Sequence, residues 1–209
     1  MNSFISLTPW IHEVLKKVFQ SDILHVRWLN TLSYLENCGA RKIAACEHPT
    51  LVREEILKHA SEEFRHAYYL KCQIKKITTQ PVENYSLAHL MGGISALQYL
   101  NSLDLKTSRY LRQAGVPSLK IKEYSYYLVT YAIELRAQEL YPCYAEYLKL
   151  HASKVRVNSI LAEELEHLQE MSTSLTLMKN GLKYAQVICG YEADLCKNWL
   201  GQIIHSIDS

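Results

Sequence analysis

Apolar residues recur at three- and four-residue spacing along almost the whole chain, and no segment of useful length alternates between apolar and polar positions as a strand does. The pattern predicts an all-α protein. Proline, glycine and short polar stretches divide it into segments. We expect helices at about 8–20, 22–46, 51–77, 118–150, 153–180 and 182–207, with one or two connecting helices between 86 and 113.

Several helix ends carry capping signals. Thr8, with a capping hydroxyl, precedes a proline at the start of the first helix, and Ser21 stands directly before the long second helix. Thr50 and Ser153 are candidate caps for the helices at 51–77 and 153–180, and Pro142 is expected to kink the helix at 118–150.

The length of 209 residues fits a single helical domain over 1–209. Lys and Arg total 23 against 21 Asp and Glu, so the net charge of +2 gives no reason to expect nucleic acid or an anionic membrane as a partner. The six cysteines form no C-x-x-C pair, which favours reduced thiols in a cytoplasmic protein. No export signal or run of eighteen apolar residues is present, so no membrane span is predicted.

A motif occurs twice. The stretches EEFRH at 62–66 and EELEH at 163–167 both read E-E-x-x-H. Because residues three apart share a helix face, Glu63 with His66, and Glu164 with His167, each direct an oxygen and a nitrogen toward one point. Both faces are otherwise apolar, and a buried lone carboxylate is costly, whereas carboxylates and imidazoles around bound cations compensate one another. The repeat therefore predicts metal ligands.

Two further glutamates complete the predicted ligand set. Glu36 lies well inside the helix at 22–46, on a largely apolar face. In the helix at 118–150, Glu134 has the more apolar face, and it precedes Glu164 by nearly the same distance as Glu36 precedes Glu63. Glu139 stays open as the alternative. Four helices with this set match the composition of a two-metal carboxylate site.

Three residues next to these ligands have candidate roles. Glu62 and Glu163 directly precede the predicted ligands, so each could accept a hydrogen bond from the distal nitrogen of the opposing histidine. His59 shares the face of Glu63 and His66. It is an additional candidate ligand, a substrate-pocket base or a hydrogen-bonded core histidine.

With one glutamate and one E-E-x-x-H motif repeated in order, the sequence resembles the ferritin-like carboxylate-bridged diiron proteins over about 22–180, and the EEFRH form is most similar to their bacterial oxygenase branch. Glu166 stands where the first motif has Arg65, a departure from an exact repeat. The resemblance implies a four-helix bundle with additional N-terminal, connecting and C-terminal helices. It also implies two iron ions, or an iron and manganese pair, held by the matched residues Glu36, Glu63, His66, Glu134, Glu164 and His167.

The resemblance implies an oxidoreductase that uses O2 to oxidise a small organic substrate. A cysteine-ligated iron module is not evident in the sequence, so an external electron donor is expected, and a homodimer is a candidate assembly. One alternative is a ferritin- or rubrerythrin-like ferroxidase or peroxide scavenger. Another is a noncatalytic helical interaction protein, in which Arg41 and Arg65 would pair with the inward carboxylates.

Overall fold

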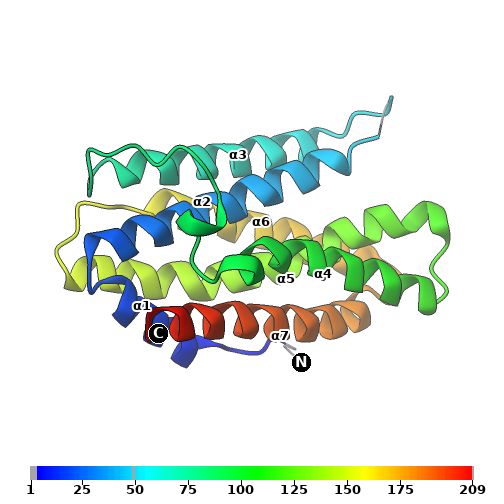
Figure 1. Ribbon diagram of the computed structural model, residues 1–209. Coiled ribbons are helices and arrows are strands. Elements are labelled where there is room, and N and C mark those ends of the chain that lie inside the picture. Colours follow the sequence, from blue (N-terminus) through cyan, green and yellow to red (C-terminus); the bar gives the residue numbers. More distant parts are fainter. Residues whose placement is uncertain (1–3, 49, 209) are drawn as a thin grey trace.

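The computed structural model describes residues 4–48 and 50–208, and within these ranges all regular secondary structure is helical (Figure 1). The elements in chain order are α1 (Thr8–Val18), α2 (Asp22–Ala45), α3 (Glu54–Ile74), the short 3₁₀ helix η1 (Leu87–His89), α4 (Gly93–Gln113), α5 (Ser118–Leu150), α6 (Asn158–Leu177) and α7 (Gly181–Asp208).

The helices pack in two neighbouring groups. Helix α2 packs along α3, to which a short loop joins it, and α5 packs against α6 (Figure 1). Helix α7 lies against α4, α5 and α1 and forms an outer layer. Ile43, Ile56, Tyr126 and Met171, one residue from each of α2, α3, α5 and α6, belong to one buried cluster. These four helices therefore enclose a common interior.

The helix starts agree with the predicted caps at one position and differ at others. Ser21 caps α2 by accepting a hydrogen bond from the backbone N–H of Leu24. The predicted caps Thr50 and Ser153 are wrong, because α3 begins at Glu54 and α6 at Asn158. The side chain of Ser153 instead accepts a hydrogen bond from the backbone N–H of Val155, which keeps the chain in a turn.

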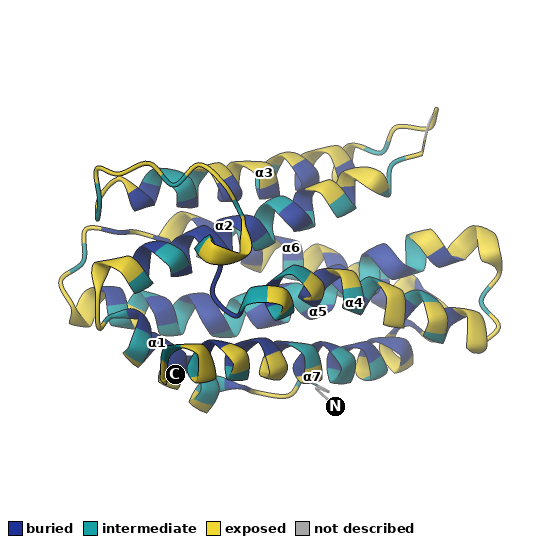
Figure 2. Cartoon of the chain, in the orientation of Figure 1, coloured by how far each residue is buried: buried dark blue, intermediate teal, exposed yellow. Residues whose placement is uncertain are grey.

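The buried residues lie on the helix faces that point inward (Figure 2). Apolar clusters fill both ends of the helix packing, one around Trp28 and Leu29 and the other around Leu103 and Leu128. Burial of this apolar area is the main favourable contribution to folding. Buried carboxylates and imidazoles lie between the two clusters, where a core of this kind ordinarily carries leucine.

No disulfide joins the six cysteines, all of which lie in the described ranges. None of the helices in the described ranges is both long enough and apolar enough to cross a membrane.

Candidate metal centre

Four helices carry the inward-facing polar residues. On α3, His59, Glu63 and His66 follow one another at spacings of four and three residues, which places them on one face. Helix α6 contributes Glu164 and His167 from the second motif. All five side chains are buried.

Helices α2 and α5 supply one glutamate each. Glu134 on α5 is buried, whereas Glu36 on α2 keeps partial accessibility. The structure therefore brings together all six of the residues predicted as ligands, and it adds His59.

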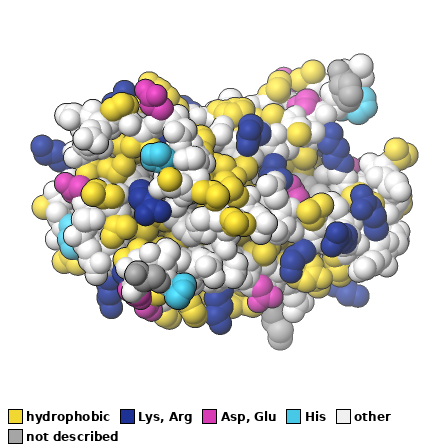
Figure 3. Space-filling model, in the orientation of Figure 1, with side chains coloured by type: hydrophobic (Ala, Val, Ile, Leu, Met, Phe, Trp, Pro, Cys, Tyr) yellow, Lys and Arg dark blue, Asp and Glu magenta, His cyan; other side chains and the backbone are white. Residues whose placement is uncertain are grey.

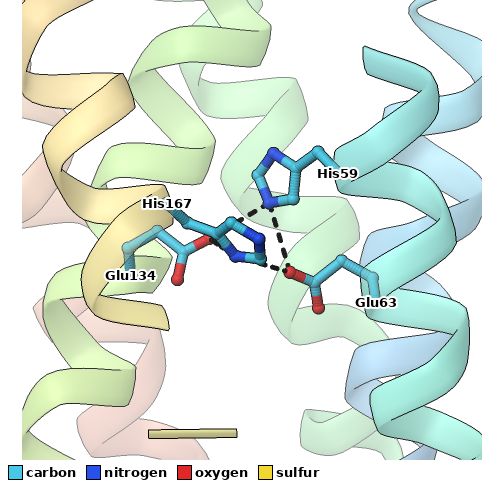
Figure 4. Close-up of side chains that lie close together, drawn as sticks. All are labelled: His59, Glu63, Glu134 and His167. Carbon is cyan, nitrogen blue, oxygen red and sulfur yellow. Dashed lines mark hydrogen bonds and ion pairs between the residues drawn. The ribbon is translucent and has the colours of Figure 1, made fainter. Parts of the chain in front are cut away.

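Ligand atoms of these residues form two groups that share Glu63. The first group consists of Glu36, Glu63, His66 and Glu164, and in each group the ligand atoms lie within 4.8 Å of one another. The second group, drawn in Figure 4, consists of His59, Glu63, Glu134 and His167. One glutamate thus lies between two positions, each of which could hold a metal ion.

The second group is compact. The Nε2 atom of His59 lies 3.2 Å from Oε1 of Glu63 and 3.3 Å from Oε1 of Glu134. The Nδ1 atom of His167 lies 3.4 Å and 3.5 Å from the same two oxygens. Two nitrogens and two oxygens from three helices therefore converge on one point (Figure 4).

The first group is richer in carboxylates. The Nδ1 atom of His66 lies 3.0 Å from Oε1 of Glu164 and 3.7 Å from Oε2 of Glu63. Glu36 accepts a hydrogen bond from the hydroxyl of Tyr141 on α5. Burial and the neighbouring Glu63 and Glu164 carboxylates raise the pKa of Glu36. A cation bound here would favour the ionised form of all three glutamates.

An outer pair of carboxylates fixes the tautomers of two histidines. Nε2 of His66 lies 2.8 Å from Oε2 of Glu163, and Nε2 of His167 lies 2.9 Å from Oε2 of Glu62. These contacts cross between α3 and α6 as the sequence analysis expects. Because an ionised carboxylate only accepts hydrogen bonds, each Nε2 carries a proton, and each Nδ1 faces the cluster, where it offers a lone pair to a cation once its own proton is displaced.

The donor atoms inside the cluster fit a cation. Among the described residues, Nδ1 of His66 and of His167, Oε2 of Glu134 and Oε1 of Glu164 are buried without a hydrogen-bond partner. Buried polar atoms are normally paired, because an unpaired one costs free energy. Lone pairs of imidazole and carboxylate cannot satisfy one another, whereas a metal ion between them accepts both. These residue types suit Mn²⁺, Fe²⁺ and Zn²⁺.

Without a cation, the cluster has to balance its charge by protonation. Burial lowers the pKa of His66, but the Glu164 and Glu63 carboxylates outweigh it and raise that pKa to about 11. Burial also lowers the pKa of His59, but the Glu134 and Glu63 carboxylates outweigh burial and raise that pKa to about 9. Burial and the Glu134 and Glu63 carboxylates raise the pKa of Glu164 to about 8. Two divalent cations would carry the charge that balances the four carboxylates and would displace these protons.

Basic side chains do not neutralise the four inward carboxylates. Among the described residues, no Lys or Arg forms an ion pair with Glu36, Glu63, Glu134 or Glu164. Arg65 pairs with the outer Glu163 instead, and Arg41 donates to the sulfur of Cys38. The geometry therefore gives no support to a noncatalytic core held by arginine and glutamate pairs.

Glu139, the alternative ligand on α5, lies outside the cluster. Its carboxylate accepts hydrogen bonds from the hydroxyls of Ser6 and Thr8 and from the backbone N–H of Leu7, and it pairs with Arg136. Arg136 in turn donates to the buried Glu192 on α7. Glu139 therefore anchors the start of α1 to α5, and Glu134 is the glutamate of α5 that faces the cluster.

A cavity of about 640 Å³ adjoins the cluster between α2, α4 and α5. Glu36, Glu63, Glu134 and Glu164 all line it, whereas the rest of its wall is mostly apolar. The partial accessibility of Glu36 follows from this contact. A molecule in the cavity would thus lie directly against the four carboxylates.

Comparisons of the chain with protein-family models, with curated proteins and with solved structures found no match.

Proposed function

We propose that the protein is a non-haem dimetal oxidoreductase, of the ferritin-like carboxylate-bridged diiron type, that uses O2 to oxidise a small organic substrate. One observation carries the proposal. Four carboxylates and three imidazoles form two groups with a shared glutamate, and unpaired donor atoms point into both.

Each residue has a defined part in this proposal. Glu36, Glu63, His66 and Glu164 would hold one ion, and His59, Glu63, Glu134 and His167 the other, with Glu63 shared. Glu62 and Glu163 orient the imidazoles and make them more basic. A pair of iron ions, or an iron and manganese pair, would supply the electrons that O2 accepts and the oxidising power that attacks the substrate.

The surrounding residues control protons and water. The Tyr141 hydroxyl donates to Glu36, so it holds this carboxylate in place and keeps a proton at the edge of the cavity. The hydroxyl of Tyr126 lies 3.0 Å from Nδ1 of His59 and fixes the orientation of that ring. The apolar wall of the cavity keeps water from the reacting atoms, which strengthens electrostatic interactions there.

The cavity favours oxidation of an organic molecule over an iron-handling role. Ferroxidase chemistry needs only a path for a hydrated cation, whereas this chain encloses a largely apolar space against the ligands. Apolar cavities of several hundred Å³ with a few polar groups are typical of organic ligand sites.

The test uses protein reconstituted with Fe²⁺ under anaerobic conditions. We expect O2 uptake when O2 and a chemical reductant are added, and we expect oxidised product when a suitable substrate is present. Glu63→Gln should abolish both, while Glu139→Gln, a change in a glutamate of α5 outside the cluster, should retain them. A protein that binds two metal ions per chain but consumes no O2 would refute the proposal.

A further inference from the structure

The cavity beside the carboxylates has a closed end and an open end. Buried side chains close the end that lies against α7, among them Tyr99, Leu140 and Trp199. At the opposite end, where α4 ends and α5 begins, Arg112 and Lys122 are exposed to solvent, and Leu105 in the middle of α4 is exposed as well. A ligand therefore enters near the turn between α4 and α5.

The cavity is elongated. Its lining on α5 runs from Ser118 at the N-terminal end to Tyr141, with Glu134 in the deeper part. At 1.5 Å per helical residue, Lys122 at the opening and Glu134 beside the candidate metal centre are separated by about 18 Å along the axis. Between them the α5 wall includes Val129 and Ile133, and α2 contributes Ile43. The space suits an extended apolar chain better than a compact polar molecule.

The opening carries positive charge. Lys42, Arg112 and Lys122 line it against a single carboxylate, that of Asp104, which pairs with Lys42 across α2 and α4. Within the described ranges, the side chain of Arg112 has no hydrogen bond or ion pair, and the side chain of Lys122 has only a 3.5 Å contact with the backbone carbonyl of Glu47. Lys and Arg side chains gather on the right of the face that α4 crosses (Figure 3). Two cations at the opening are thus available to an anion.

We propose that the substrate is an extended amphiphile with an anionic head group, of which a fatty acid is the simplest example. Its head lies at Arg112 and Lys122, and its apolar chain runs along α5 toward Glu36 and Glu134. This inference rests on the proposed function for the chemistry, but binding of the amphiphile does not require metal.

Gly39 provides a direct way to test the position of the chain. It lies on α2, one helical turn after Glu36, and lines the cavity. A Cβ atom built on Gly39 has no neighbour within 4 Å, so a larger side chain would extend into open space. Gly190 on α7 also has no neighbour within 4 Å of its Cβ position, yet it is not part of this cavity. Gly190→Trp is therefore a matched control for Gly39→Trp.

The experiment measures binding of dodecanoate and of dodecanol to metal-free protein by calorimetry. We expect dodecanoate to bind wild type and the Gly190→Trp variant equally, and to lose at least about tenfold in affinity in Gly39→Trp, a change of about 1.4 kcal/mol. The double variant Arg112→Gln, Lys122→Gln should bind dodecanoate about tenfold more weakly than wild type and should bind dodecanol with unchanged affinity. Should Gly39→Trp fail to fold by circular dichroism, Ala137→Leu fills the same cavity from α5 and should also weaken binding.

The outcomes separate this inference from the proposed function. If dodecanoate does not bind while the metal-loaded protein consumes O2, the proposed amphiphilic substrate is wrong and the proposed function stands. If dodecanoate binds and Gly39→Trp blocks it, but the loaded protein consumes no O2, the substrate site stands and the function is wrong. Equal affinity for dodecanol and dodecanoate would refute an anionic head group on the substrate. An equal loss of dodecanoate affinity in Gly39→Trp and Gly190→Trp would refute the proposed position of the apolar chain.

Discussion

Glu63 is the residue whose removal should have the largest effect on metal binding, because it is the only member of both ligand groups. The change Glu63→Gln keeps the size of the side chain and removes its charge. We expect wild type to bind two divalent ions per chain and Glu63→Gln to retain neither. Glu36→Gln and Glu134→Gln each alter one group, so each should retain one ion.

The same geometry gives the expected stability changes. An ion that binds only the folded state stabilises it by about 2.7 kcal/mol when its concentration is 100 times its Kd. Two such sites contribute about 5.4 kcal/mol, and the single-site variants lose about half of this. For a chain of 150–250 residues, 1 kcal/mol corresponds to about 2–4 °C in Tm. The metal-dependent rise in Tm should therefore be about 11–22 °C in wild type and about half as large in Glu36→Gln and Glu134→Gln.

Elemental analysis and thermal unfolding, each with and without metal, measure these quantities. Glu139→Gln is the control, because this carboxylate lies on the same helix as Glu134 but pairs with Arg136 and the start of α1. It should keep both ions and the full metal-dependent rise in Tm, even if its own Tm is lower. Retention of both ions by Glu63→Gln, or loss of both by Glu139→Gln, would refute the assignment of the ligands.

Three further predictions concern the outer carboxylates and two buried residues elsewhere in the chain. Glu62→Gln and Glu163→Gln should each weaken metal affinity by about 10- to 100-fold in a chelator competition, with two ions still bound at saturation. Burial lowers the pKa of His25 to about 4, so this histidine contributes stability above its unfolded pKa that is lost as pH falls. Chemical denaturation of wild type should therefore give a lower free energy of unfolding at pH 4.5 than at pH 7.5. In His25→Gln this decrease should be smaller by up to about 3 kcal/mol. Arg136→Met should lower the free energy of unfolding by about 3–5 kcal/mol in the same assay, because the buried Glu192 loses its ion pair and keeps the hydrogen bond from the Tyr99 hydroxyl. An Arg136→Met variant as stable as wild type would contradict the role of this pair.

The sequence predicted the parts of the site that depend on local helix geometry. Glu63 with His66, and Glu164 with His167, could be identified because a spacing of three residues determines a shared face. The crossed contacts of Glu62 and Glu163 followed from their position next to these ligands. The all-helical fold was predictable for the same reason, since a periodicity of three to four residues is a local property.

The choice between Glu134 and Glu139 could not be made from the sequence alone. Both lie on the same helix, and the partners that draw Glu139 away include Ser6 and Thr8, more than 130 residues distant in the chain. His59 raised the same difficulty. Its spacing from Glu63 placed it on the correct face, but the opposing Glu134 and His167 come from other helices. Long-range packing decided both cases.

The caps of α3 and α6 were mispredicted for a related reason. A serine or threonine before an apolar run is a local signal, but the start of a helix also depends on which residues tertiary packing buries. Val155 and Val157 are fully buried before α6 begins, so packing of these two side chains holds the chain after Ser153 against the core. Tertiary contacts therefore moved the start of α6 by about one helical turn.

The two ligand groups differ in a way that bears on the proposed chemistry. Glu36 is the partly accessible member of the first group, and the Tyr141 hydroxyl that donates to it also lines the cavity. In the second group, His59 is buried beneath Tyr126. All four carboxylates face the cavity, whereas the imidazoles lie behind them, on the side where Glu62 and Glu163 bind two of the rings. The carboxylates proposed as exchangeable ligands thus face the cavity, and the imidazoles proposed as fixed ligands lie on the far side of the cluster. In the proposed enzyme, the substrate would therefore meet the dimetal centre at Glu36, where a carboxylate can move without disturbing the imidazoles that retain the ions.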